Sequence, residues 1–255
     1  MAPLEGQYLL IIGGSSGMGF SVAKLALASG AKVAIASSSA DKVQRAISRL
    51  GGDGGGGSDQ VSGHVVNLAS ADPEVSLEHL FTEVTQGGQQ SLDHIINTAG
   101  RGMPRPIAEI DLDSANELAR LPLFIPMLIG KLAPRFLKGG GFKSNSSIIF
   151  TSGQVAEKPI PGYSVLAAFV LAQRGLARNL AVDLAPIRVN VVAPGPTETE
   201  MWGEHCDIIK KMVVGQSLLG KPASPDEVAE AYIYLIKNTD ATGSIVSSNG
   251  GITLK

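Results

Sequence analysis

An apolar run that breaks into a cluster of glycines near the N-terminus constrains this chain more than any other feature. Residues 8–12 are Tyr-Leu-Leu-Ile-Ile, glycines follow at 13, 14, 17 and 19, and apolar residues recur at helical spacing from Val22 to Leu27. The pattern predicts a strand, a tight turn and a helix. Glycine permits the sharp turn and lets the backbone approach a ligand closely, and the N–H groups at the helix start face any pyrophosphate placed there.

A second predicted strand, at 30–36, completes a strand–helix–strand unit around this glycine turn. The spacing Gly-x3-Gly-x-Gly differs from the G-x-G-x-x-G fingerprint, and glycine clusters occur in many turns. The prediction of a dinucleotide cradle therefore depends on the order of the elements around the turn. The residues of the turn predicted to bind the cofactor are Gly13, Ser15, Ser16, Gly17, Met18 and Gly19.

The residues after the second predicted strand indicate which dinucleotide is bound. An acidic side chain at this place binds the ribose hydroxyls of NAD, and none is present at Ser37, Ser38 and Ser39. These hydroxyls, with the ammonium of Lys42, favour the phosphate of NADP(H). Ser38 or Ser39 also fits as the cap of a helix beginning near Asp41, and the two roles are compatible.

Length and charge narrow the class of protein. A chain of 255 residues is long enough for a full core and short enough for one α/β domain, so a single domain over 1–255 is expected. The net charge of −2 and the pI of about 6.1 provide no basic surface for nucleic acid or for an anionic membrane. The expected partners are a small-molecule substrate and further copies of the chain.

The N-terminal sequence and the number of cysteines indicate the cellular compartment of the protein. The first apolar run is confined to 8–12 and no charged segment precedes it, so the pattern predicts neither a signal peptide nor a membrane span. Cys206 is the single cysteine, so an internal disulfide is excluded and a reducing compartment, the cytoplasm, is expected. We interpret Cys206 as an incidental thiol.

The remaining chain alternates apolar runs with helical patterns, which predicts a parallel sheet covered by helices. Pro122 and Pro126 fall inside the longest predicted helix and should bend or interrupt it. The glycine-rich segment 51–59 predicts a mobile surface loop. Strands are predicted at 61–68, 92–97, 147–153 and 187–192, a seventh strand with its closing turn at 243–251, and helices at 73–85, 113–137, 163–185 and 225–237.

Two predicted strands end in asparagine-containing segments. Asn67 and Leu68 end the third strand, and Asn97 is followed by Ala99 and Gly100 after the fourth. Ligands of open parallel sheets bind outside the carboxyl ends of the strands, so these residues are predicted to bind the cofactor. Asn67 can accept from adenine and Asn97 can brace the turn, although asparagine is also an ordinary turn former.

The fifth predicted strand and the helix after it supply the candidate catalytic pair. Ser152 lies at a strand end and Tyr163 at a helix start. Two such O–H groups can position a carbonyl or an imine between them, so both residues are predicted to be catalytic. The alternative is that Ser152 only ends a strand and Tyr163 only packs on the sheet.

A proline-rich turn and a segment of mixed polarity follow the sixth predicted strand. We expect residues 197–222 to form a lid over the substrate, including Trp202 and His205. His205 fits either a general acid or a solvated surface histidine. The residues of the turn predicted to bind a carboxamide and the pyrophosphate are Pro194, Gly195, Thr197 and Thr199.

Together these residues resemble the short-chain dehydrogenase/reductase superfamily over essentially the whole chain. The motifs that carry the resemblance are the glycine turn, Asn97-Thr98-Ala99-Gly100, Tyr163, Arg188 to Gly195 and Asn249-Gly250-Gly251. The resemblance implies an α/β fold with a Rossmann-type, doubly wound parallel sheet of seven strands in a single domain. It also implies a nicotinamide cofactor bound by the residues above, Tyr163 included, no metal, and a homodimer or homotetramer.

The active site departs from the family pattern. The family places a lysine four residues after the tyrosine, where this chain has Ala167, and its helix asparagine falls at Leu121. The serine lies eleven residues before the tyrosine instead of thirteen, so Thr151, Ser152 or Gln154 fits that role. A tyrosine without a neighbouring cation has a pKa of about 10 and is a poor acid–base group at neutral pH, which disfavours ordinary alcohol oxidation.

Three shorter runs are similar to the fungal bifunctional reductase/Diels–Alder enzymes of indole alkaloid biosynthesis. They are Thr151 to Gly153, Pro161 to Tyr163 and Leu180 to Asn190. Those enzymes also lack the lysine, but they carry an aspartate where this chain has Ile160 and a tryptophan where it has Tyr163. Their helix arginine is not matched in register, since Arg120 lies about a turn away.

Three functions follow as hypotheses. The first is an NADPH-dependent reductase of an imine, an iminium or an activated carbonyl in secondary metabolism, because reducing an iminium needs a hydride but no proton. The second is a non-redox cyclase of the Diels–Alder type, or an isomerase, on the same fold. The third is a catalytically silent binding protein.

Overall fold

The computed structural model describes residues 4–53, 59–100, 104–138 and 145–255. Seven strands form one parallel sheet in the order β3-β2-β1-β4-β5-β6-β7. The predicted fold class is confirmed. The strands are β1 (Tyr8–Ile12), β2 (Lys32–Ser37), β3 (Val61–Val65), β4 (His94–Asn97), β5 (Ser147–Thr151), β6 (Arg188–Pro194) and β7 (Ile245–Ser248).

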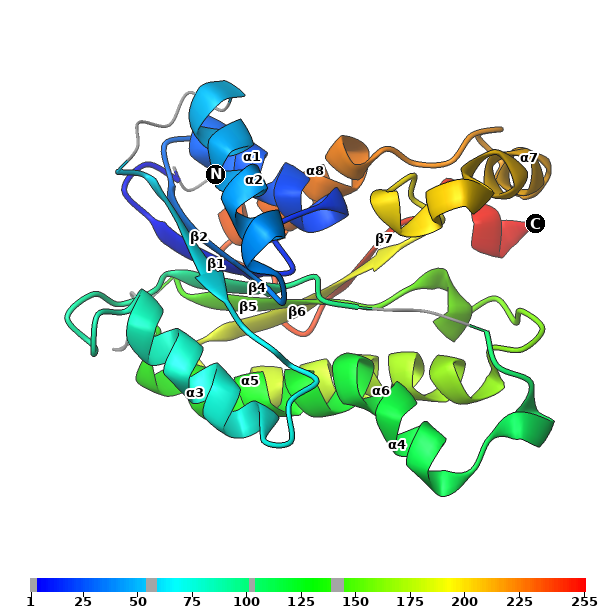
Figure 1. The fold of residues 1–255 in the computed structure, drawn as a ribbon, viewed down its shortest axis with the longest axis horizontal. Coiled ribbons are helices and arrows are strands. Elements are labelled where there is room, and N and C mark those ends of the chain that lie inside the picture. Colours follow the sequence, from blue (N-terminus) through cyan, green and yellow to red (C-terminus); the bar gives the residue numbers. More distant parts are fainter. Residues whose placement is uncertain (1–3, 54–58, 101–103, 139–144) are drawn as a thin grey trace.

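Helices cover both faces of the sheet, with α1, α2 and α8 on one side and α3, α4, α5 and α6 on the other (Figure 1). Because β4 pairs with β1 rather than with β3, the strand order reverses between β1 and β4 and opens a crevice there. The helices are α1 (Gly17–Ala28), α2 (Ala40–Asp53), α3 (Pro73–Val84), α4 (Leu112–Ala119), α5 (Ile125–Leu132), α6 (Ser164–Asp183), α7 (Cys206–Gln216) and α8 (Pro225–Lys237).

The two faces of β1 belong to two separate hydrophobic cores. Leu10 and Ile12 point into the core shared with α3 and α5, whereas Leu9 and Ile11 point into the core shared with α1 and α8. A strand buried on both faces reads as a continuous apolar run, which is the pattern seen in the sequence. The double burial fixes β1 and, with it, the start of the glycine turn.

The long predicted helix is interrupted, as its prolines predict. It is divided into α4 and α5, and the segment Arg120–Phe124 between them is π-helical. Pro122 lies within that segment and Pro126 at the start of α5, where each removes a backbone donor. The interruption places Leu121 at the crevice described below.

Several predicted boundaries are wrong. The predicted loop at 51–59 does not begin at Gly51, because buried Val43, Ala46 and Leu50 carry α2 on to Asp53; residues 54–58 lie outside the described residues. β3 ends at Val65 and β4 begins at His94, so both predicted strands are too long. β7 covers Ile245–Ser248 within the predicted strand and closing turn at 243–251. β6 continues through Pro194, so the proline-rich turn begins only at Gly195.

Helix α6 is the one described helix that is long and apolar enough, by length and composition, to cross a membrane. It packs along β6 and covers one face of the sheet (Figure 1). A sheet-covering core helix has the same composition, so this single helix is weak evidence for a membrane span.

His94 is a buried histidine at the start of β4. Its Nε2 lies 2.8 Å from Gln7 Oε1, and its Nδ1 lies 2.8 Å from Ser147 Oγ. Since Oε1 can only accept, Nε2 carries the proton and Nδ1 accepts from the serine hydroxyl. Burial, reinforced by the charges of Arg188 and Lys138, lowers the pKa of His94 to about 3.

The buried neutral His94 predicts a pH dependence of folding. Between about pH 6 and pH 4, His94 binds a proton in the unfolded chain but stays neutral in the folded protein. The contribution of His94 therefore lowers the free energy of unfolding by about 1.4 kcal/mol for each unit that the pH falls. When the free energy of unfolding is measured by urea at several pH values, it should fall less steeply with falling pH in a His94→Gln variant than in the native chain. His79→Gln, at a histidine whose side chain is 79% exposed, is the matched control. Equal slopes for the native chain and His94→Gln would contradict this account.

Candidate cofactor crevice and active site

The turn after β1 brings α1 unusually close to the strand ends. Gly13 has a φ of +88° and its N–H donates to Ala36 O at 2.8 Å. A Cβ at Gly19 would lie 2.4 Å from Gly13 O and 2.5 Å from Thr98 Oγ1. No side chain fits at that distance, so the helix can begin here only with glycine at position 19.

A cavity of about 560 Å³ opens directly above this turn. It brings together predicted residues from the turn and from the ends of β2, β3 and β4. The predicted residues that line it are Gly13, Ser15, Ser16, Gly17, Met18, Gly19, Ser37, Ser38, Lys42, Asn67, Leu68, Ala99, Gly100 and Thr199.

Other predicted residues do not line this cavity. They are Ser39, Asn97, Ser152, Tyr163, Pro194, Gly195 and Thr197. Thr98, Leu121, Glu200 and Met201 also line it, although the sequence did not predict that they bind the cofactor. Thr98 stands within a motif already noted, and its hydroxyl donates to Ile12 O at 3.1 Å. The other three come from tertiary packing, which leaves no local pattern in the sequence.

The three serines at the end of β2 and directly after it take two different positions. Ser37 and Ser38 line the cavity beside Lys42, and Ser15 Oγ donates to Ser37 Oγ at 2.9 Å. Ser39 lies outside the cavity, and its Oγ accepts from Lys42 N at 3.4 Å at the start of α2. The capping role that the sequence offered therefore belongs to Ser39, and the ligand-facing role remains with its neighbours.

Asn97 and Thr151 join three elements behind the cavity. Asn97 Oδ1 accepts from Ala99 N at 3.2 Å, and Thr151 Oγ1 donates to Asn97 O at 2.7 Å. The Thr151 oxygen lies 2.7 Å from the hydroxyl of fully buried Tyr232, which therefore donates to it. This chain of hydrogen bonds fixes the ends of β4 and β5 against α8.

Ser152 is held by an arginine on α6. Its hydroxyl donates to Val170 O at 3.2 Å and accepts from Arg174 Nε at 3.0 Å. Arg174, with a side chain only 9% exposed, also donates to Gly153 O at 3.0 Å and pairs with Glu157. The Ser152 proton is thus engaged with the protein, and one guanidinium fixes the connection between β5 and α6.

Tyr163 stands at the N-cap of α6 and is half-buried. Burial raises the pKa of its phenol above the usual range, which weakens it as an acid. Ala167 lies one helical turn further on and donates its N–H to Tyr163 O at 2.7 Å. Lys158, the lysine nearest in sequence, donates instead to the carbonyl oxygens of Ile252 and Lys255.

The predicted lid segment folds as a 3-10 helix, Glu200–His205, followed by α7. Trp202 is half-buried and His205 is exposed. The carboxylate of Glu200 reaches back to α1, where Gly17 N donates to its Oε2 at 3.0 Å. The segment therefore touches the cradle in this structure.

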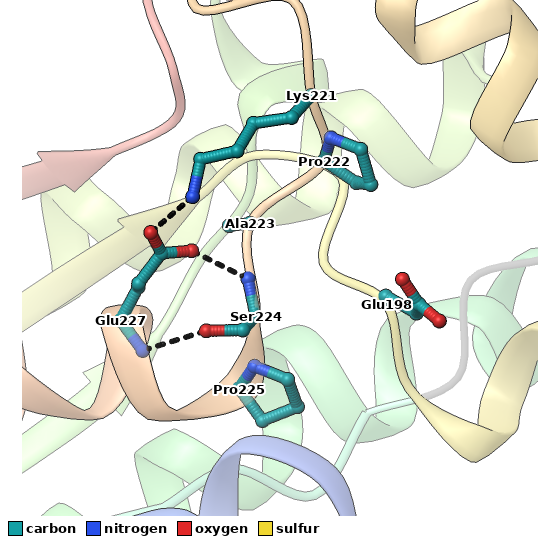
Figure 2. Close-up of a pocket in the computed structure, with 7 residues that line it drawn as sticks. All are labelled: Glu198, Lys221, Pro222, Ala223, Ser224, Pro225 and Glu227. Carbon is teal, nitrogen blue, oxygen red and sulfur yellow. Dashed lines mark hydrogen bonds and ion pairs between the residues drawn. The ribbon is translucent and has the colours of Figure 1, made fainter.

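A second, more open pocket of about 440 Å³ lies at the start of α8 (Figure 2). Ser224 caps α8, and its N–H donates to Glu227 Oε2 at 2.8 Å. Glu198, which also lines the pocket, pairs with Lys210 outside it. The ion pair with Lys221 and these hydrogen bonds lower the pKa of Glu227 to about 2. We interpret this pocket as a helix cap. No cluster of metal-ligating side chains occurs among the described residues.

The chain is similar to known proteins over almost its whole length. A family model described as an SDR-like Rossmann domain matches residues 3–255. The short-chain dehydrogenase/reductases ATR9 of Stachybotrys chlorohalonatus and fsr5 of Gibberella fujikuroi are 44% and 36% identical, covering 100% of this chain and 100% and 97% of their own. The MalC reductase/Diels-Alderase from Malbranchea aurantiaca superposes with a TM-score of 0.92 at 32% identity, over 98% of this chain and 97% of MalC.

Gly19→Ala should weaken binding of the nicotinamide dinucleotide that the family fold implies, with NADPH as the probe, about tenfold or more, because the added Cβ forces α1 away from the turn. Gly175→Ala is the matched control, since a Cβ at this exposed helical glycine meets nothing within 4 Å. Fluorescence titration with NADPH, after circular dichroism has shown that both variants fold, measures the effect. Equal affinities for the two variants would contradict the geometry given for the cradle.

Arg174→Met should destabilise the fold by about 2 kcal/mol, because it removes the donors to Ser152 Oγ and Gly153 O, whereas water can solvate the exposed Glu157 carboxylate. Arg178→Met, an exposed position on the same helix, should change stability by less than about 0.5 kcal/mol. Urea unfolding at neutral pH measures both. Similar small losses for the two variants would show that the guanidinium does not hold the β5–α6 connection.

Proposed function

Because this chain belongs to the short-chain dehydrogenase/reductase family, we propose that it is an NADPH-dependent reductase acting on an imine, an iminium or an activated carbonyl. The observation that carries the proposal is the cavity that joins the start of α1 to the hydroxyls after β2. The family fold implies a nicotinamide dinucleotide, and the close approach of Gly19 to Gly13 suits a pyrophosphate.

The choice of NADPH rests on the charge at the end of β2. Ser37, Ser38 and Lys42 line the cavity there and supply two hydroxyls and an ammonium. The single acidic residue among the described lining residues is Glu200, which contacts the start of α1 instead. A 2′-phosphate beside Ser37 therefore meets donors and a cation and no carboxylate.

The substrate class follows from the weak proton donors. When bound, the cofactor supplies a hydride from its nicotinamide ring. Burial weakens the Tyr163 phenol as an acid, and the Ser152 proton is engaged with Val170 O. An alcohol product requires a proton on its oxygen, whereas an iminium becomes a neutral amine on accepting the hydride alone. The residues at the end of β5 therefore suit the iminium best.

A non-redox cyclisation is the second candidate, and the similarity to MalC favours it. MalC is described as a reductase/Diels-Alderase and shares this fold at a TM-score of 0.92. A pocket that holds a substrate in its reactive conformer accelerates ring closure without a proton relay. In both proposals residues 197–222 act as a lid over the substrate.

Incubation of the purified chain with NADPH and a panel of cyclic iminium ions, imines and ketones tests the proposal. Loss of nicotinamide absorbance together with a reduced amine is expected, fastest with the iminium ions. An isomeric product formed without cofactor turnover would select the cyclase instead. Turnover of simple ketones as fast as of iminium ions would contradict the argument from Tyr163 and Ser152.

A charge variant, with its affinities for NADPH and NADH measured by fluorescence titration, tests the choice of cofactor. Ser37→Asp should weaken NADPH binding about tenfold or more by repulsion of the 2′-phosphate, while NADH binding is unchanged or improves. Ser48→Asp adds the same charge at an exposed position of α2 and should leave both affinities unchanged. Equal NADPH affinities for the two variants would overturn the assignment of NADPH.

A further inference from the structure

The carboxylate of Glu200 occupies the start of α1. Its Oε2 accepts from Gly17 N at 3.0 Å, although 183 positions separate the two residues in sequence. Gly17 is the first residue of the helix, and the N-cap Ser16 makes no side-chain hydrogen bond to it. The anion-binding end of α1 is thus satisfied by an acidic side chain from the lid segment.

The residue before Glu200 packs against Gly17, the first residue of α1. A Cβ at Gly17 would lie 3.0 Å from Thr199 Cγ2 and 3.3 Å from Thr199 Cβ. Thr199, Glu200 and Met201 also line the 560 Å³ cavity, so this part of the segment lies over the cradle. A group bound to Gly17 N must therefore displace the Glu200 carboxylate, and the segment that carries this carboxylate packs beside Gly17.

Within the described ranges, Glu200 has no cationic partner. It is exposed, and no lysine or arginine among the residues that the structure describes pairs with it. Neighbouring Glu198, by contrast, pairs with Lys210 at 2.6 Å. The Gly17 amide is therefore the partner that holds the Glu200 carboxylate, and a solvent-exposed contact of this kind is weak enough to exchange.

We propose that Glu200 is an internal competitor of the cofactor pyrophosphate, a residue that sets dinucleotide affinity. One N–H group cannot serve a carboxylate and a phosphate together, and the two anions repel each other at this distance. Cofactor binding expels Glu200 from α1 and moves the start of the lid, which couples entry of the cofactor to lid position. This inference rests on the proposed function, because it takes the cradle to bind a dinucleotide.

Calorimetric titration of Glu200→Gln and Glu200→Ala with NADPH, and separately with inorganic pyrophosphate, tests the proposal. Both variants should bind each probe about two- to fivefold more tightly than the native chain, which is the usual effect of one charge at a helix terminus. Glu204→Gln removes the same charge from an exposed position just beyond the kink at Gly203, and its affinities should be unchanged. Circular dichroism establishes that all three variants fold.

The outcomes separate this inference from the proposed function. Equal or weaker binding by both Glu200 variants would overturn the competitor role, because Glu200 would then be neutral or a cofactor ligand. If no variant binds NADPH or NADH, the proposed function fails, and the pyrophosphate titration still decides on Glu200. Tighter pyrophosphate binding by the Glu200 variants alone supports competition; equal binding by all variants, or binding by none, contradicts it.

Discussion

The approach of α1 to the turn after β1 is the constraint on which the rest of this structure depends. A Cβ at Gly19 would fall 2.4 Å from Gly13 O, so the helix can start beside the strand end only because glycine stands there. The burial of β1 on both faces fixes the strand that leads into the turn. The glycine at position 19 and the buried strand β1 together place the N-terminal amide groups of α1 beside the crevice where the strand order reverses.

The sequence predicts those features that short-range patterns determine. Residues 8–12 read as a buried strand because both faces are covered, and residues 225–237 form the predicted helix, in which Pro225 takes a first-turn position that needs no backbone donor. Pro122 and Pro126 predict an interruption because proline lacks a donor. Where tertiary packing overrides composition the prediction is wrong, as at Gly51, which α2 includes because Val43, Ala46 and Leu50 bury its apolar face.

The candidate site divides in the same way. The glycine turn and the serines after β2 could be predicted to line one crevice, because strand ends of a parallel sheet meet at one edge. The state of Ser152 could not, since it depends on Arg174, a helical residue whose pattern reads as ordinary. The contact of Glu200 with Gly17 is equally long-range, and an acidic residue in a lid segment carries no sign of the amide it meets.

We propose that the amide groups at the start of α1 receive the phosphates of a nicotinamide dinucleotide. Nuclear magnetic resonance of the labelled chain, with the backbone amide signals followed during titration with NADPH, tests it most directly. The account predicts that the largest shifts occur at Gly17 and Gly19 and at the residues after β2, with the signals of β7 unmoved. Saturating NADPH that leaves the Gly17 and Gly19 signals in place would contradict the account.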